Sequence, residues 1–143
     1  MDVIEPYTSA GGFKFGASYN EVVSALGEPC STERSRLGET IVRYDGFGAT
    51  ISSRGVVEVY FLPGVDVSLL GFDVFGDAAA FGSLCILDGD PKEFMGFIIL
   101  FKLGVTMTGF HDGDAAQQAI TAFEKGRWDR LLGEMQEYQA ASC

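Results

Sequence analysis

The chain has 143 residues, a length typical of one domain that buries its own core. It carries 20 Asp and Glu against 10 Lys and Arg, a formal net charge of -10. Such a surface repels phosphate backbones and anionic lipid and attracts basic partners, although the same acidity is also typical of proteins that only need to stay soluble. The charge therefore disfavours nucleic-acid binding and membrane-surface binding.

Cysteine content and apolar runs indicate the compartment. Cys30, Cys85 and Cys143 are odd in number and far apart, which argues against a disulfide framework and a CxxC metal site. The longest apolar run, from Phe94 to Phe101, is shorter than the roughly 20 residues that a membrane-spanning helix needs. The beginning, MDVIEPYTSAGG, lacks the basic start and apolar segment of a secretory signal. We therefore expect a soluble, cytoplasmic protein.

In chain order, the first predicted elements are a short strand in FKF, residues 13–15, and a short helix. Ser18 and Glu21 have the spacing of a capping box, in which each side chain accepts from the backbone amide of the other residue. Gly27 can adopt the left-handed conformation that ends a helix, and Pro29 prevents its continuation. The apolar residues of this helix lie on one face: Tyr19, Val22, Val23 and Leu26.

A series of strands is predicted next. The runs IVRYD at 41–45, ATISS at 49–53 and VVEVYFL at 56–62 are rich in β-branched and aromatic residues. Glycines separate them by only a few residues, which favours an antiparallel meander with tight turns. A further strand is predicted within VSLLGFDVF, residues 67–75.

The pattern FGASYNEVVSALGEP, from Phe15, is similar to FGDAAAFGSLCILDGDP, from Phe75. In the second copy Asp77 takes the capping position, Phe81, Leu84 and Cys85 make the apolar face, and strands follow from Phe94 and Val105. Two tandem units, residues 13–62 and 73–110, are therefore predicted, unless the similarity is a chance product of a glycine-rich chain.

The C-terminal region, residues 112–138, is predicted to be helical. Ala116, Ile120 and Phe123 fit one helical face after an Asp114 cap, and a second stripe follows Gly126. The second stripe contains Trp128, Leu131, Leu132 and Met135. The predicted fold class is α+β: a single domain, 1–143, with an antiparallel sheet, helices mainly on one face and a C-terminal helical segment.

No pattern of catalytic residues is apparent in the sequence. The chain lacks GxxxxGK[ST] and GxSxG, and GFGATI lacks the third glycine and the following helix of a dinucleotide site. His111, the only histidine, lies in the polar sequence GFHDGD and is interpreted as a solvated loop residue. The segment DGDPKE, with Asp88, Asp90 and Glu93, lacks a calcium-loop pattern. We therefore predict a protein that is not an enzyme, without catalytic residues, cofactor or metal.

One compact group of basic residues occurs near the C-terminus. Lys125, Arg127 and Arg130 alternate with Glu124 and Asp129, a mixture that is not typical of a nucleic-acid surface. The single tryptophan of this region is interpreted as a packing anchor rather than an exposed platform for stacking bases.

Two motifs carry a resemblance to a protein family. The pattern F-x-F-G-x-S-x-x-E-V-x-x-x-L-G-x-P, Phe13 to Pro29, and F-x-K-G-R-W-D, Phe123 to Asp129, resemble small acidic bacterial proteins, many of which look like immunity proteins of toxin systems. The resemblance implies a cytoplasmic antidote that binds a cognate toxin domain and blocks its active site. Acidic antidotes suit basic toxins because complementary charge raises the association rate. The partner-binding residues expected on this basis are Asp88, Asp90, Glu93, Asp112 and Asp114.

Two other functions fit the same sequence. The chain can be a structural or small-molecule-binding module that uses the concave side of its sheet, without catalysis. It can also be an enzyme whose site combines His111 with carboxylates from distant parts of the chain.

Overall fold

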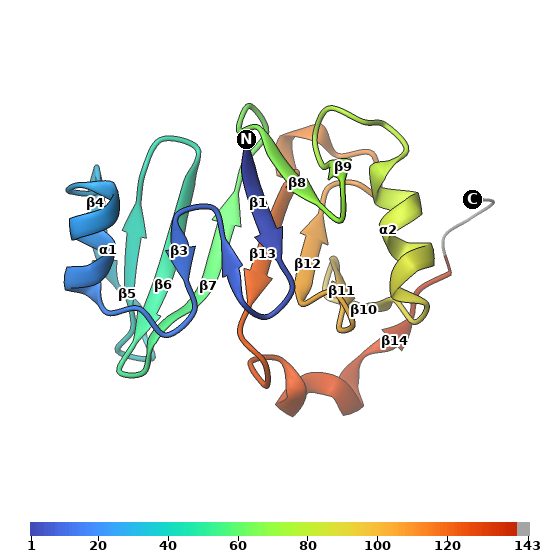
Figure 1. Ribbon diagram of the computed structural model, residues 1–143. Coiled ribbons are helices and arrows are strands. Elements are labelled where there is room, and N and C mark those ends of the chain that lie inside the picture. The colour runs from blue at the N-terminus through green and yellow to red at the C-terminus, as the bar shows by residue number, and fades with distance from the viewer. Residues whose placement is uncertain (140–143) are drawn as a thin grey trace.

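Two sheets form the frame of the protein, for which the computed structural model describes residues 1–139 (Figure 1). The larger sheet has nine strands, all paired antiparallel, in the order β14-β10-β11-β12-β13-β7-β6-β5-β4. Its strands are β4 (Ser31–Arg34), β5 (Thr40–Arg43), β6 (Phe47–Ser52), β7 (Gly55–Phe61), β10 (Lys92–Phe94), β11 (Phe97–Leu100), β12 (Val105–Thr108), β13 (Ala119–Phe123) and β14 (Gln136–Glu137).

The smaller sheet has five strands in the order β3-β2-β1-β8-β9. These are β1 (Asp2–Glu5), β2 (Ser9–Ala10), β3 (Phe13–Lys14), β8 (Val67–Leu69) and β9 (Phe72–Asp73). The β1·β8 pair is parallel, with Ile4 opposite Leu69. The prediction of one antiparallel sheet is therefore incomplete, because the first residues of the chain pair with a segment more than sixty positions away.

The predicted first helix is confirmed as α1 (Tyr19–Leu26), with its capping box. The Ser18 hydroxyl accepts from the Glu21 amide at 3.1 Å, and the Glu21 carboxylate accepts from the Ser18 amide at the same distance. Gly27, at φ 84°, ends the helix. Local sequence therefore determines both ends of α1.

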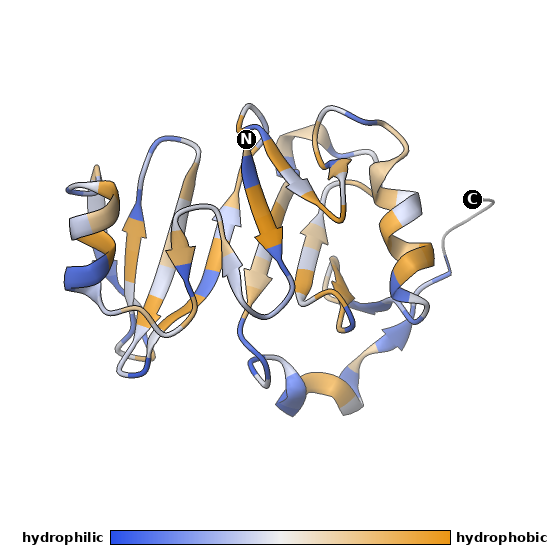
Figure 2. Cartoon of the chain, in the orientation of Figure 1, coloured by the Kyte–Doolittle hydropathy of each residue, from blue (hydrophilic) through white to orange (hydrophobic). Residues whose placement is uncertain are grey.

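The second helix, α2 (Ala80–Asp88), follows its predicted signals in part. Gly89 adopts the left-handed conformation, φ 82°, and ends the helix. At the start, the Asp77 carboxylate accepts from the Ala79 amide at 2.9 Å, so it caps the turn before the helix rather than the helix itself. Figure 2 shows that α2 is apolar along much of its length.

The two halves of the chain have the same order of elements. Helix α1 is followed by the meander β4 to β7, and α2 by the meander β10 to β13. Strands β7 and β13 pair at the centre of the large sheet and join the halves, with Thr121 opposite Tyr60. The second meander ends at Phe123 rather than at residue 110. The origin of this order in a duplication stays a prediction.

The predicted C-terminal helices are wrong. Residues 112–138 contain two short 3-10 helices, η1 (Ala115–Gln117) and η2 (Asp129–Glu134), together with β13 and β14. Ile120 and Phe123 belong to β13, which lies between β7 and β12 in the centre of the sheet. The i, i+3 spacing of these two residues fits a helical face, but pairing on both sides makes the segment a strand.

The large sheet is covered on one face along its length and on the other face over its second half. On one face, Ile98, Met107 and Ile120 share a core with Val22 of α1 and Leu84 of α2, and with the small sheet. On the other face, residues 124–137, called here the C-terminal segment, cross the second half of the sheet. In that segment Trp128 packs against Phe97 and Phe123, with ring centroids at 5.5 and 6.4 Å, as expected for a packing anchor.

The capping box gives a direct test of local stability. We expect Ser18→Ala to lower the free energy of unfolding by about 1 kcal/mol, because the Glu21 amide loses its acceptor. The matched control is Ser24→Ala, at an exposed position of the same helix, which should leave stability unchanged or slightly raise it. Denaturant unfolding measures both, and equal losses in the two variants would contradict the role of the cap.

Gly55 and Gly64 form a second matched pair. Both have positive φ, 102° and 103°, but a Cβ on Gly55 would lie 2.3 Å from backbone atoms of Gly16, whereas nothing lies within 4 Å of one on Gly64. We expect Gly64→Ala to cost about 1 to 2 kcal/mol of stability from backbone strain alone. Gly55→Ala should cost about 3 kcal/mol or more, because the clash adds to that strain. Similar melting temperatures for the two variants would contradict the close approach at Gly55.

Candidate functional site

Charge is distributed unevenly between the two ends of the large sheet. The β5–β6 and β12–β13 connections of this sheet lie at the end that is uppermost in Figure 1, together with the β7–β8 connection, which leads into the small sheet, and the β9–α2 connection, which leaves it. None of these connections contains Lys or Arg. We call this the acidic end, and its carboxylates are Asp45, Asp66, Asp73, Asp77, Asp112 and Asp114. No ion pair found within residues 1–139 involves any of them.

The structure separates the five residues predicted to bind a partner. Asp112 and Asp114 lie at the acidic end, in the β12–β13 connection. Asp88 and Asp90 lie at the opposite end, where α2 passes into β10. Glu93 is in β10 itself. They do not form one surface.

Asp88 was expected to be exposed, and this is wrong, because its relative exposure is only 5%. Its carboxylate accepts from the backbone amides of Lys102 at 2.8 Å and Asp90 at 3.2 Å. Burial raises the pKa of Asp88 above its ordinary value. The residue therefore holds the end of α2 to the β11–β12 turn.

The other two residues of this group have basic neighbours. Asp90 lies 3.3 Å from the ammonium group of Lys92. The carboxylate of Glu93 lies 3.7 Å from Nε2 of His111. Each of these carboxylates therefore faces a basic group of its own chain.

His111 was interpreted as a solvated loop residue, and this is wrong. Its side chain is only 12% exposed, and its ring meets that of Tyr138 edge to face at 5.8 Å. Nδ1 of His111 is buried without a hydrogen-bond partner in the described structure. The aromatic residues of the neighbouring α2 and β12–β13 region, Phe75, Phe81 and Phe110, stack beside this pair. His111 is therefore largely buried by its contacts with aromatic side chains.

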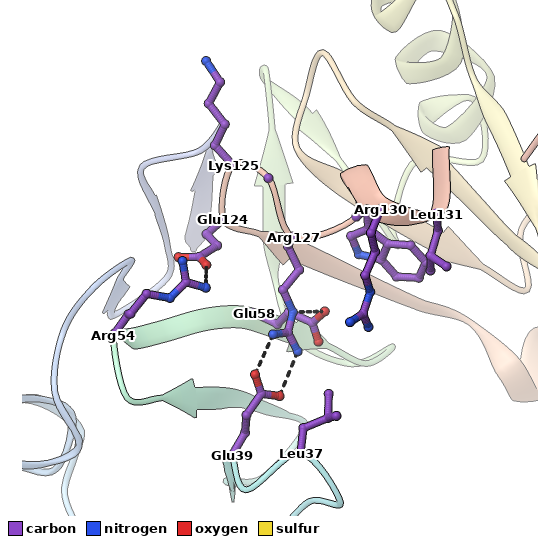
Figure 3. Close-up of a pocket in the computed structure, with 11 residues that line it drawn as sticks. Leu37, Glu39, Arg54, Glu58, Glu124, Lys125, Arg127, Arg130 and Leu131 are labelled. Carbon is purple, nitrogen blue, oxygen red and sulfur yellow. Dashed lines mark hydrogen bonds and ion pairs between the residues drawn. The ribbon is translucent and has the colours of Figure 1, made fainter. Parts of the chain in front are cut away.

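The end of the sheet opposite the acidic end contains a hollow of about 410 Å³ between the C-terminal segment, the β4–β5 connection and strand β7 (Figure 3). Its lining mixes both signs of charge with two leucines. The lining residues are Leu37, Glu39, Arg54, Glu58, Glu124, Lys125, Gly126, Arg127, Trp128, Arg130 and Leu131.

Arg127 is the centre of this hollow. Its Nη1 and Nη2 donate to the two carboxylate oxygens of Glu39 at 2.7 and 3.0 Å, and its Nε donates to Glu58 at 2.9 Å. The three side chains are 13 to 24% exposed, so the pairing is largely shielded from water. Hydrogen bonds from Arg127 lower the pKa of Glu39, and those same bonds raise the pKa of Arg127.

The remaining cations of the hollow differ in their partners. Arg54 pairs with Glu124. Lys125 and Arg130 are exposed and have no ion pair with any residue in 1–139. The hollow therefore holds two cations without a carboxylate partner in a chain whose net charge is -10.

Sequence reasoning did not select these residues. A signal was present, because the motif F-x-K-G-R-W-D at residues 123–129 supplies five of the lining residues, from Glu124 to Trp128. The two glutamates that bind Arg127 are 88 and 69 positions away, and no local pattern connects them to it.

The described residues show no group of three or more His, Cys, Asp or Glu side chains placed to hold a metal ion. In the same part of the chain, no helix has the length and apolar character to cross a bilayer. Cys30 is exposed and Cys85 buried, whereas Cys143 lies outside the described residues.

Comparisons with protein-family models, curated proteins and solved structures give no match for this chain.

The Arg127 pairing predicts a stability difference that depends on pH. We expect Arg127→Gln to lower the free energy of unfolding by about 2 to 3 kcal/mol at neutral pH, because two partly buried carboxylates lose their partner. The pKa of Glu39 is lowered from its ordinary 4.5, so its stabilising contribution is full above that pH and is lost as the pH falls through the lower folded value.

Urea unfolding from pH 7 to pH 3 should therefore show wild type and Arg127→Gln converging in acid. The matched control is Arg54→Gln, which breaks a pair whose arginine is 70% exposed and should cost less than about 1 kcal/mol. A difference between wild type and Arg127→Gln that stays constant with pH would contradict the ionic origin of the effect.

Proposed function

We propose that this protein is a stoichiometric inhibitor of the immunity type, which binds a basic toxin domain in the cytoplasm and blocks that domain's active site. The observation that supports it best is the acidic end: five aspartates on four connections and Asp73 at the end of β9, without a Lys or Arg among them. The partner in this proposal is a protein, and neither a cofactor nor catalysis by this chain takes part.

The acidic end has two properties suited to such a contact. Its loops begin or end on strands of the two packed sheets, so their positions are set by a rigid frame. Several of the carboxylates are also oriented by turns: Asp73 accepts from the Gly76 amide at 3.0 Å, and Asp112 accepts from the Asp114 amide at 3.2 Å. Each keeps a second oxygen that can accept from a partner's Lys or Arg.

The proposal keeps two of the five contact residues expected from the sequence, Asp112 and Asp114. Asp88 is buried inside the fold. Asp90 and Glu93 lie away from the acidic end and face Lys92 and His111. The contact surface is therefore proposed at the loops, with Asp45, Asp66, Asp73 and Asp77 added to it.

The test is complex formation with the product of the neighbouring gene. We expect a one-to-one complex whose association rate falls as salt is added, because complementary charge steers the encounter. In Asp66→Lys/Asp114→Lys, which changes two carboxylates without hydrogen bonds in the described structure, the rate at low salt should fall by about tenfold or more.

The matched control is Glu5→Lys/Glu134→Lys, which makes the same change of charge at two exposed positions outside the acidic end. It should change the association rate much less. Stopped-flow or surface-binding kinetics measure both variants. The proposal fails if the neighbouring product does not bind, or if both double variants slow association equally.

A further inference from the structure

Two further hollows lie beside the one that contains Arg127, at the end of the sheet opposite the acidic end. A second hollow of about 470 Å³ shares Arg54 with the first, and a third of about 380 Å³ shares Arg34, Tyr19 and Thr40 with the second. We call these three neighbouring hollows the basic groove. It follows the ends of β4 to β7 and continues under the C-terminal segment.

Every carboxylate that lines the basic groove already has a basic partner. Glu39 and Glu58 bind Arg127, and Glu124 binds Arg54. Glu33 lies 2.7 Å from Arg43. Each carboxylate of the groove is therefore held by a basic group of its own chain, although Glu39 and Glu58 share the single charge of Arg127.

Three cations of the groove have no such partner. Arg34, Lys125 and Arg130 are exposed and form no ion pair within residues 1–139. The lining has five Lys and Arg side chains against four carboxylates, so the groove is locally positive on a protein of net charge -10, and these three charges are the ones left to act on molecules in solution.

We infer that the basic groove binds an acidic peptide segment of a partner protein. Figure 3 shows Lys125 and Arg130 on different sides of Arg127 and pointing in different directions. Cations that do not converge on one point do not suit a single phosphate group, and they match separate carboxylates along an extended chain.

The apolar lining favours a peptide over other anions. Leu37, at 68% exposure, and Leu131 border the first hollow together with Trp128. Side chains of a peptide can cover these surfaces between its carboxylates. A long nucleic acid would instead bring many phosphates towards a protein with twice as many acidic as basic residues.

This inference is independent of the proposed function, because it concerns the opposite end of the sheet and a ligand of opposite charge. If the groove binds no acidic peptide, the proposal of a basic partner at the acidic end still stands. If the acidic end binds no basic partner, the inference about the groove still stands.

The experiment uses a synthetic peptide that repeats Glu-Glu-Leu, titrated into the full chain at low salt. Trp128 is the only tryptophan and lines the groove, so its fluorescence reports binding there, and calorimetry gives the affinity. We expect saturable binding that Lys125→Glu/Arg130→Glu weakens by about tenfold or more. The matched control is Lys14→Glu/Lys102→Glu, at two exposed positions outside the groove, which should weaken binding by less than about twofold.

Three results would overturn the inference: absence of saturable peptide binding, an equal loss in the two double variants, or tighter binding of an oligothymidylate than of the peptide. Displacement of the peptide by millimolar inorganic phosphate would also overturn it, since it would indicate a phosphate site. Thermal unfolding of each variant verifies that it folds. If the groove variant does not fold, Arg34→Glu, in the exposed edge strand β4, makes the same comparison against Lys14→Glu.

Discussion

The hydrogen bonds of Arg127 with Glu39 and Glu58 are the interaction on which the outer face of this protein depends. They join three parts of the chain: the loop before β5, the middle of β7 and the segment that leaves β13. With this point fixed, the C-terminal segment is held across the sheet and Trp128 reaches Phe97. The same guanidinium binds two glutamates and balances the charge of one of them, so the neighbouring cations Lys125 and Arg130 decide the sign of the local charge.

The second organising feature is the β7·β13 pair, which joins the two meanders edge to edge. Because each meander runs antiparallel throughout, alternate connections fall at opposite ends of one continuous sheet. The connections at one end carry aspartate without Lys or Arg, and the free cations of the groove gather at the other. This alternation separates the aspartates of the β5–β6 and β12–β13 connections from the cations of the groove that are unpaired within residues 1–139, and each of the two proposals above concerns one of these surfaces.

Sequence patterns within a few residues predicted the helix ends and most strands of the large sheet. Ser18 and Glu21 specify the start of α1, Gly89 specifies the end of α2, and the runs of β-branched residues give most strands of the large sheet. Long-range contacts decided the rest. Ile120 belongs to a strand because strands pair with it on both sides. The sequences of β1 and β8 contain no pattern that predicts their pairing with each other.

The hollow around Arg127 was not predicted for the same reason, since the glutamates that bind Arg127 are distant in sequence. The partner residues were only partly placed, because burial of Asp88 depends on amides from a turn fourteen positions away.

The aspartates of the acidic end and the cations of the basic groove that are unpaired in the described part of the chain form a separation of charge between two distant surfaces of the protein. A charged body at a distance exerts a torque on such a separation of charge, so the molecule turns towards it before any side chains touch. Two approaching molecules of opposite charge would therefore meet opposite ends of the same sheet, and their encounters would be sorted by orientation as well as by rate. A chain of equal net charge with its aspartates spread evenly would attract a basic partner but would not turn one particular end towards it.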